Sequence, residues 1–396
     1  MNDKKRSRIL YVADKLITPD RIILNSGVLT EDDKILAVGG LSGFSMDNTF
    51  ELKKFDNAYI TPGFIDTHIY GAGGCDCSRL SDSPGTLEEM SRVLGYSGVT
   101  GFFPSVVSDA PEKMLQNLND LAEAIRRPMP GAEPLAINVT GPFINPARSG
   151  SQKAEFSQKV DIGFAKELVA AGKGMIKLMT FAPELENSSK LIEYLRSVNI
   201  HPSMGYSMAD GKQTLDAIDA GANHCTHLFN CMLPLHQRDI GLAGVVLTDS
   251  RVAAELIIDG RHVHPRMIEI ACNCKLATRI IGISNCTMAF RMPDGLYHTG
   301  PTDFKVENGY SHTIDGTLVG TTSMLNTGWH SLMSSGHLPE TRAAQAVTLN
   351  PAANFDIQDR GLILPGRRAD LAIFENNTNR LLATIRRGEV IYSHEK

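Results

Sequence analysis

The chain lacks any long hydrophobic stretch. None of its apolar runs approaches the roughly 18 residues that a membrane-spanning helix needs, so no membrane partner is expected. The basic residues near its start are not followed by the apolar segment of a secretory signal. Its seven cysteines are an odd number. Without an export signal, they are expected to be reduced thiols in the cytoplasm.

The chain also lacks an excess of positive charge. It has 39 Lys and Arg against 44 Asp and Glu, which gives a net charge of −5. Nucleic-acid binding needs clustered cations that meet the phosphates, so this balance argues against such a partner. No Gly-x-Gly-x-x-Gly follows the first predicted strand, and Gly71-Ala-Gly73-Gly74 is a poor substitute. A bound dinucleotide is therefore not expected.

Short strand-like segments occur at both ends of the chain. Neither end has enough of them to bury a core alone, so we predict that the two ends combine in one small β-sandwich domain. The predicted division is 1–58 plus 362–396 for this domain and 59–361 for the rest. The strand-like segments are 8–13, 21–29, 34–38, 50–55, 370–374, 381–386 and 389–392.

Between these ends, short apolar runs alternate with helix-like stretches such as 86–95 and 112–126. Alternating strands and helices predict a parallel sheet. Eight repeats favour a closed, TIM-like (β/α)8 barrel of the α/β class, whose enzymes place their chemistry at the C-terminal ends of the strands. The runs are 58–65, 100–106, 134–139, 175–181, 200–204, 222–227, 252–258 and 279–283.

Chemically distinctive residues follow several of the predicted strands. They include His68 after the first, Thr140 after the third, Tyr206 after the fifth and His227 after the sixth. Because the strands of a barrel end on one face, these side chains are predicted to meet there. The segments that carry such residues are, in order, PGFIDTHIY, TGPF, FAPE, THLFNCM, GLAG, DGRH, GTLVG, LNPA and PGRRAD.

This ordered set of segments resembles the N-acetylglucosamine-6-phosphate deacetylases of the amidohydrolase superfamily. The resemblance implies hydrolysis of an acetamide on a phosphorylated amino sugar, in which a divalent metal activates water and an aspartate transfers the proton. In that family a glutamate after strand three and histidines after strands five and six hold the metal. The aspartate follows strand eight, and some members bind a second metal through a His-x-His on strand one.

At most of these positions the sequence departs from the family pattern. Thr140 stands for the glutamate, Tyr206 for the strand-five histidine and Asn285 for the aspartate. A catalytic zinc site normally has three protein ligands, and an amide cannot serve as a general base. We therefore expect a divergent member with no metal cofactor, and zinc or another divalent metal is the less favoured alternative. The positions that keep a histidine are His68 and His227, while Tyr70 replaces the second histidine of His-x-His.

The positions that hold the sugar phosphate in that family are kept. They are Asn230 and Arg238 after strand six and His262 after strand seven. Guanidinium and imidazole groups suit a phosphate. The resemblance therefore implies a phosphorylated amino sugar, or a similar anionic sugar-like ligand, as the small-molecule partner, and it also implies a homodimer. The substrate-binding candidates further include Cys231, near the predicted pocket mouth, and His68.

Tyr206, His227, Asn285 and Thr140 are the candidate catalytic residues. Tyr206 and His227 can carry protons, which permits a metal-independent reaction. The alternative is that Tyr206 fills the space of a metal and His227 is a structural residue. Three functions stay open: an enzyme with altered chemistry on a sugar phosphate, which is favoured; a genuine deacetylase with unexpected metal ligands; and a non-catalytic binding or regulatory protein. By resemblance the protein is a hydrolase.

Overall fold

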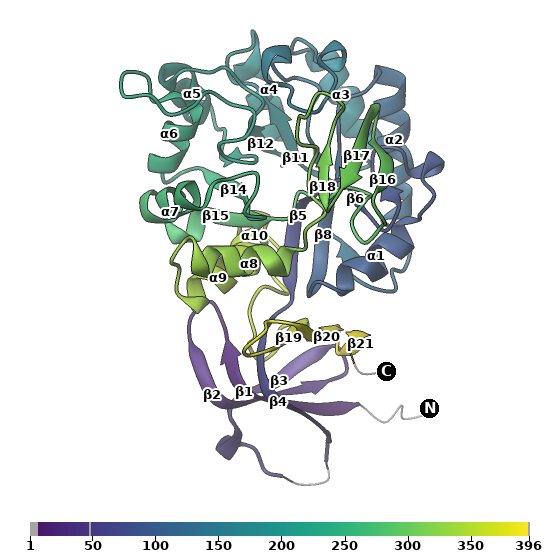
Figure 1. Ribbon diagram of the computed structural model, residues 1–396, viewed down its shortest axis with the longest axis vertical. Helices are drawn as coiled ribbons and strands as arrows, with labels where there is room; N and C mark the ends of the chain where they lie inside the picture. The colour runs from purple at the N-terminus through teal and green to yellow at the C-terminus, as the bar shows by residue number, and fades with distance from the viewer. Residues whose placement is uncertain (1–6, 47–48, 395–396) are drawn as a thin grey trace.

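The computed structural model describes residues 7–46 and 49–394. Seven strands from both ends of the chain form one sheet, in the order β21-β20-β19-β4-β1-β2-β3. Figure 1 shows this sheet at one end of the molecule, next to the barrel. The strands are β1 (Arg8–Ile17), β2 (Ile22–Glu31), β3 (Lys34–Gly40), β4 (Glu51–Pro62), β19 (Leu371–Glu375), β20 (Leu381–Arg386) and β21 (Glu389–Ser393).

The two ends of the chain share one core in this sheet, which confirms a small domain made from both. Tyr11 of β1, Ile60 of β4, Ile373 of β19 and Ile385 of β20 are buried together. Strand β4 joins the two halves, because it pairs with β1 in parallel and with β19 in antiparallel fashion. The predicted division at 58/59 and 361/362 stays a prediction, and its extremes, 1–6 and 395–396, lie outside the described residues.

A second sheet, entirely parallel, forms the barrel. Each strand pairs with the next in the order β5-β8-β10-β11-β12-β13-β14-β15, and β9 (Glu133–Pro134) pairs with β8. The backbone amide of Asn285 donates to the carbonyl of His68 at 3.0 Å, so the segment after β15 lies against β5. The barrel strands are β5 (Phe64–Ile69), β8 (Val99–Val106), β10 (Ile137–Val139), β11 (Ile176–Phe181), β12 (His201–Met204), β13 (His224–Cys225), β14 (Ala253–Ile257) and β15 (Ile280–Ile283).

The barrel prediction is confirmed, but the first predicted strand was wrong in its position. Residues 58–62 belong to β4 of the small sheet, and the barrel strand begins at Phe64. Gly63 separates the two strands at a point where a side chain would meet Thr100 at 2.4 Å. The apolar run therefore spans two domains, with Ile60 in the small core and Phe64 in the barrel core.

Helices cover the outside of the barrel (Figure 1). Several begin at capping residues that satisfy the free amides of the first turn. Thr86 accepts from the Glu89 amide while the Glu89 side chain accepts from the Thr86 amide, and Asp210 and Gln213 do the same. The helices are α1 (Leu87–Gly95), α2 (Pro111–Ala124), α3 (Ile162–Ala171), α4 (Ser188–Ser197), α5 (Gly211–Asp219), α6 (Gly241–Thr248), α7 (Pro265–Cys274), α8 (Leu325–Ser334), α9 (Glu340–Val347) and α10 (Leu349–Asn354).

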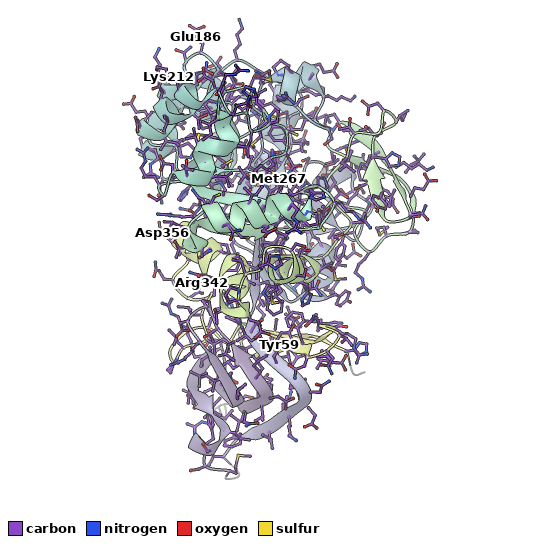
Figure 2. The ribbon with its side chains drawn as sticks, turned by 60° about the vertical axis from the view of Figure 1, so that its left-hand side comes forward. Tyr59, Glu186, Lys212, Met267, Arg342 and Asp356 are labelled. Atoms are coloured by element: carbon purple, nitrogen blue, oxygen red, sulfur yellow. The ribbon has the colours of Figure 1, made fainter. Side chains whose placement is uncertain are left out.

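Aromatic side chains join the small sheet to the barrel. Figure 2 places Tyr59 of β4 at this junction. Its ring lies 5.5 Å from that of Trp329 on α8 and 5.4 Å from that of Phe374 on β19. Phe64 of β5 contacts the same tryptophan at 5.7 Å. These packed aromatic pairs fix the start of β5 relative to the small domain.

Two short sheets lie outside the predicted pattern. One joins β6 (Gly71–Ala72) to β7 (Cys75–Asp76). The other is an antiparallel sheet of β16 (Gly295–Thr299), β17 (Thr302–Glu307) and β18 (Tyr310–His312), inserted after the last barrel strand. Among the helices of the described residues, none combines the length and apolar character that crossing a membrane requires.

Candidate active site at the strand ends

A cavity of about 220 Å³ lies at the C-terminal ends of the barrel strands. The structure brings most of the predicted site residues to it: Tyr206, His227, Asn230, Cys231, His262 and Asn285 all line it. The other residues of the lining are Tyr70, Val107, Gly150, Ser151, Gln152, Ile257, Thr287, Thr299 and 317–320. The convergence follows from the barrel, since parallel strands deliver their C-terminal residues to one face.

Thr140, a predicted catalytic residue, does not line this cavity. Its side chain is buried, and its hydroxyl donates to the carbonyl of Val106 at 2.9 Å. Its own carbonyl accepts from the Gln152 side-chain amide, also at 2.9 Å. Gln152, which the sequence did not single out, therefore stands between Thr140 and the cavity.

His68 forms a fully buried pair with Glu255 of β14, a residue that the sequence did not indicate. The Nδ1 atom of His68 lies 2.9 Å from Oε2 of Glu255, and neither side chain is exposed. Burial opposes both charges, yet their attraction and hydrogen bond lower the pKa of Glu255 to about 2. Against the same burial, Tyr70 and Glu255 raise the pKa of His68 above its usual value. The pair is therefore an imidazolium and a carboxylate at neutral pH.

A chain of hydrogen bonds runs from this pair to the cavity. The Nε2 atom of His68 lies 2.9 Å from the Tyr70 hydroxyl, which lies 3.2 Å from the hydroxyl of Tyr206. Burial raises the pKa of Tyr206 well above its usual value, so its phenol is neutral and keeps its proton. The chain links a buried charge to a phenol that lines the cavity.

Two hydrogen-bond acceptors face this site without a partner among the described residues. The Nδ1 atom of His227 lies 3.0 Å from the carbonyl oxygen of Asn230, and because a carbonyl only accepts, Nδ1 carries the proton. The Nε2 atom of His227 then has a free lone pair, and it is buried and unpartnered, as is Oδ1 of Asn285. Burial, together with the charge of His68, lowers the pKa of His227 to about 3, so its ring is neutral.

His262 is held at the cavity by Asp259. Its Nδ1 atom lies 2.8 Å from Oδ2 of Asp259, while the backbone amides of Arg261 and His262 donate to Oδ1 at 2.9 Å. Burial opposes the charge of Asp259, but the hydrogen bond and charge of His262 lower the pKa of that carboxyl below its usual value. Asp259 thus fixes the imidazole and leaves Nε2 for a ligand.

Arg238, the predicted phosphate-binding cation, is not brought into the cavity. It is exposed in the loop between β13 and α6 and does not line the cavity. A different arginine, Arg148, acts on the lining, since its charge opposes the rise in the pKa of the Cys231 thiol. Burial nevertheless raises the pKa of that thiol to about 11, which keeps Cys231 protonated at neutral pH.

Several site residues have left-handed backbone conformations, which non-glycine residues rarely adopt. Their φ angles are 49° at Tyr206, 31° at His227, 55° at Cys231 and 56° at Asn285. Surrounding hydrogen bonds hold this geometry: the Ser207 amide donates to the Cys231 carbonyl at 3.0 Å. Strain of this kind persists where neighbouring structure fixes it, and it often marks functional sites.

The residues present do not fit the metal that the family pattern implies. Both ring nitrogens of His68 are engaged by Glu255 and Tyr70, and the hydroxyl of Thr140 is bonded to backbone. Tyr206 is a neutral phenol, which leaves Nε2 of His227 as the one nitrogen available from the family's positions. Over residues 7–46 and 49–394, no three His, Cys, Asp or Glu side chains come together as a metal site.

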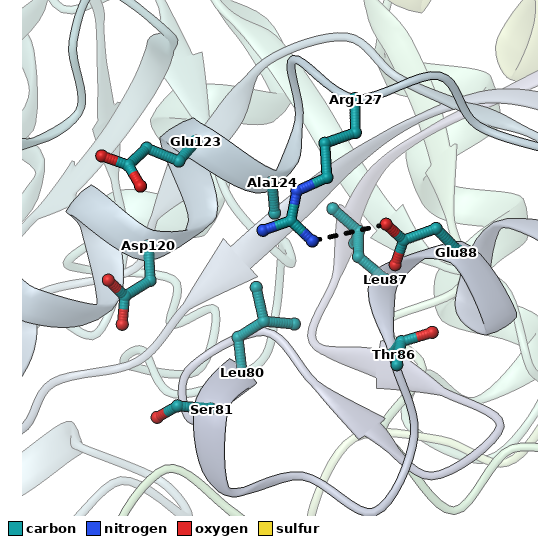
Figure 3. A pocket seen from close by; sticks show the side chains of 9 residues that line it. All are labelled: Leu80, Ser81, Thr86, Leu87, Glu88, Asp120, Glu123, Ala124 and Arg127. Carbon is teal, nitrogen blue, oxygen red and sulfur yellow. Dashed lines mark ion pairs between the residues drawn. The ribbon is translucent and has the colours of Figure 1, made fainter.

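A second hollow, of about 280 Å³, lies on the surface beside α1 and α2. Figure 3 shows its lining, in which Arg127 and Glu88 form an ion pair at 3.5 Å across one edge. Asp120 and Glu123 of α2 complete a mixed-charge rim. No strand-end residue reaches this hollow, so the strand-end cavity is the better candidate.

Comparison with known proteins agrees with this architecture. The amidohydrolase family model matches residues 59–391. An N-acetylglucosamine-6-phosphate deacetylase of Bacillus subtilis (strain 168) is 32% identical over 381 residues, which are 95% of each chain. An N-acetylgalactosamine-6-phosphate deacetylase of Escherichia coli O157:H7 is 30% identical over 322 residues, covering 81% of this chain and 85% of that one.

Solved structures give the same result. A mutant of the N-acetyl-D-glucosamine-6-phosphate deacetylase from Mycobacterium smegmatis, in complex with N-acetyl-D-glucosamine-6-phosphate, superposes with a TM-score of 0.90 at 28% identity. The match covers 98% of this chain and 100% of that one. The Thermotoga maritima N-acetylglucosamine-6-phosphate deacetylase has a TM-score of 0.84 at 28% identity, over 96% and 98% of the two chains.

Proposed function

We propose, since this chain belongs to the amidohydrolase family and groups there with the N-acetylglucosamine-6-phosphate deacetylases, that it binds a phosphorylated amino sugar in the strand-end cavity. One observation carries the proposal: the Tyr206 hydroxyl and the unpartnered acceptors of His227 and Asn285 line the same cavity as Asn230 and His262. A sugar with hydroxyl and amide groups offers the donors and acceptors that these atoms need.

The proposed chemistry is proton transfer by the chain's own side chains. In C–N hydrolysis, His227 Nε2 takes a proton from water as the water oxygen attacks the amide carbon, and Tyr206 holds the carbonyl oxygen. The amide nitrogen then takes the proton from His227 as the C–N bond breaks, giving an amine and a carboxylic acid. Because the pKa of His227 is about 3, it is a weak base and slow turnover is expected.

Calorimetric titration tests the binding proposal. N-acetylglucosamine-6-phosphate is expected to bind, while N-acetylglucosamine without the phosphate binds at least about tenfold more weakly, because charge-assisted hydrogen bonds to phosphate are strong. His262→Ala should remove much of that difference, since Asp259 holds His262 at the cavity. Equal affinity for both sugars, or no binding of either, would count against a sugar-phosphate site.

A metal-dependent deacetylase is the second candidate, and the free Nε2 of His227 favours it. Metal analysis of the purified protein decides this point, because about one tightly held equivalent of zinc would require ligands that the side-chain contacts do not offer. The variant Thr140→Glu/Tyr206→His/Asn285→Asp restores the family's donor set. It should gain zinc binding and deacetylation if the sugar is held in the family's orientation.

A non-catalytic binding protein is the third candidate, and the low basicity of His227 favours it. Release of acetate from N-acetylglucosamine-6-phosphate, followed over many hours against the His227→Gln variant, separates it from a slow enzyme. The homodimer and the cytoplasmic location stay predictions, and sedimentation of the purified chain tests the first.

A further inference from the structure

We propose that Glu255 is a positioning residue: it keeps His68 as a hydrogen-bond donor at both ring nitrogens, so that Tyr70 and Tyr206 direct a donor hydroxyl into the cavity. Glu255 does not itself line the cavity, and it acts through the intervening side chains. The direction of these hydrogen bonds does not depend on a bound ligand. Its consequence for the ligand rests on the proposed sugar-phosphate function.

The environment of Glu255 is suited to a carboxylate. Thr67 donates its hydroxyl to Oε1 at 2.6 Å, Thr226 donates to Oε2 at 3.0 Å, and His68 Nδ1 contacts Oε2 at 2.9 Å. Several donors around one carboxyl group favour its ionised form. A fully buried carboxylate also needs a neighbouring positive charge, and the imidazole of His68 supplies it.

The charge on His68 decides which way the hydrogen bonds run. An imidazolium has a proton on each nitrogen and accepts none, so its Nε2 must donate to the Tyr70 oxygen. One proton then bridges the Tyr70 and Tyr206 oxygens, 3.2 Å apart, and with Tyr70 as its donor the Tyr206 proton is left for the cavity that both side chains line. A neutral His68 would instead accept the Tyr70 proton at Nε2. The Tyr70 oxygen would then accept the proton of Tyr206, which would point away from a ligand.

Gln152 reinforces the outward direction. Its Oε1 accepts from the Ser108 amide at 2.7 Å, and one proton of its Nε2 goes to the Thr140 carbonyl. The other amide proton is available to Tyr206, and Gln152 acts to lower the pKa of that phenol, which is the effect of a donor beside its oxygen. The Tyr206 oxygen thus has a second donor nearby, and its own proton is free to point into the cavity.

This arrangement defines the group that the cavity receives. Tyr206 offers a donor, while Nε2 of His227 and Oδ1 of Asn285 offer acceptors. A secondary amide matches both, because its carbonyl accepts and its N–H donates. A free ammonium group only donates, so it leaves Tyr206 without a partner. The site should therefore prefer an N-acylated amino sugar phosphate over the free amine.

Nitrogen NMR of ¹⁵N-histidine-labelled protein at pH 8 tests the direction without any ligand. The His68 signals are assigned by their absence from the spectrum of His68→Gln. Two N–H groups on His68 are expected in the wild type, and one in Glu255→Gln, which loses the carboxylate charge but keeps an acceptor. A single N–H on wild-type His68, or two in Glu255→Gln, overturns the inference.

Calorimetric titration with N-acetylglucosamine-6-phosphate and glucosamine-6-phosphate tests the consequence for the ligand. Tyr206→Phe, which removes one hydroxyl, should weaken the N-acetyl probe about fivefold and leave the amine probe unchanged, in keeping with one net hydrogen bond. Tyr70→Phe should act in the same direction, and Tyr194→Phe, on α4 outside the cavity, is the matched control.

The two experiments test different claims, so either claim can be refuted while the other stands. If neither probe binds the wild type, the sugar-phosphate function is wrong, and the NMR result still decides the role of Glu255. If both probes bind but Tyr206→Phe weakens their binding equally, Tyr206 does not act as a donor into the cavity. That conclusion holds even if His68 carries two N–H groups. If Tyr206→Phe weakens the binding of the N-acetyl probe alone and Tyr194→Phe leaves the binding of both probes unchanged, the inferred donor role of Tyr206 is supported.

Discussion

Replacing Glu255 by glutamine should destabilise the protein in a way that depends on pH. Removing one partner of a buried ion pair costs about 3–5 kcal/mol, and we expect the lower value, about 3 kcal/mol at pH 6, because glutamine keeps the shape and one acceptor oxygen. The wild-type pair contributes most between the unfolded pKa values of its members, 4.5 for Glu255 and 6.5 for His68.

The pH dependence of this loss follows from the folded pKa values. The pKa of His68 is raised above its unfolded value of 6.5 on folding, so above pH 6.5 the native state holds a proton that the unfolded state has released. Wild-type stability then falls by about 1.4 kcal/mol per pH unit. In Glu255→Gln the buried imidazole is neutral, and this slope is absent. The difference between the two proteins should shrink by about 2–3 kcal/mol from pH 7 to pH 9.

Urea unfolding followed by circular dichroism at pH 6, 7, 8 and 9 measures this difference directly. Glu193→Gln, on the exposed side of α4, is the matched control and should follow the wild type at every pH. A difference that stays constant or widens towards pH 9 would mean that His68 is neutral in the native protein, and the charged pair would be refuted.

Three further outcomes follow from single contacts. Arg238→Ala should change the dissociation constant for a sugar phosphate by less than about twofold in titration calorimetry, because exposed charges outside a site contribute little. Thr86→Ala removes the capping hydroxyl of α1 and should lower the free energy of unfolding in urea by about 1 kcal/mol. Gly150→Ala places a methyl group 2.4 Å from the Cys231 sulfur at a φ of 61°, so ligand titration should show weaker binding with little loss of secondary structure.

Much of the fold could be predicted because it rests on local patterns. Alternating apolar runs and capped helices identify the barrel, since burial of each strand requires apolar residues at known spacing. The first strand was misplaced because one continuous apolar run, 58–65, serves two domains, and Gly63, which packs closely against Thr100, lies between the two strands. The inserted sheet of β16 to β18 follows no repeat of the barrel, so the pattern did not reveal it.

The site residues also fall into those that local patterns predict and those that they do not. Tyr206, His227 and Asn285 come together because each directly follows a strand, and strand ends converge. Glu255 could not be found, because within its apolar strand it resembles an isolated polar residue, and its partner His68 lies on a strand distant in the sequence. Arg238 has the expected motif position, but its loop turns it to solvent, which spacing alone does not show.

The pairing of β4 with β19 has a consequence for the order of events during synthesis. Leu371 of β19 pairs with Pro62 of β4, so β4 keeps an open edge until every barrel strand has left the ribosome. An unpaired strand edge is a template for association with other chains. The nascent protein therefore still exposes one strand edge to other chains after the barrel is complete, until the last three strands have been made.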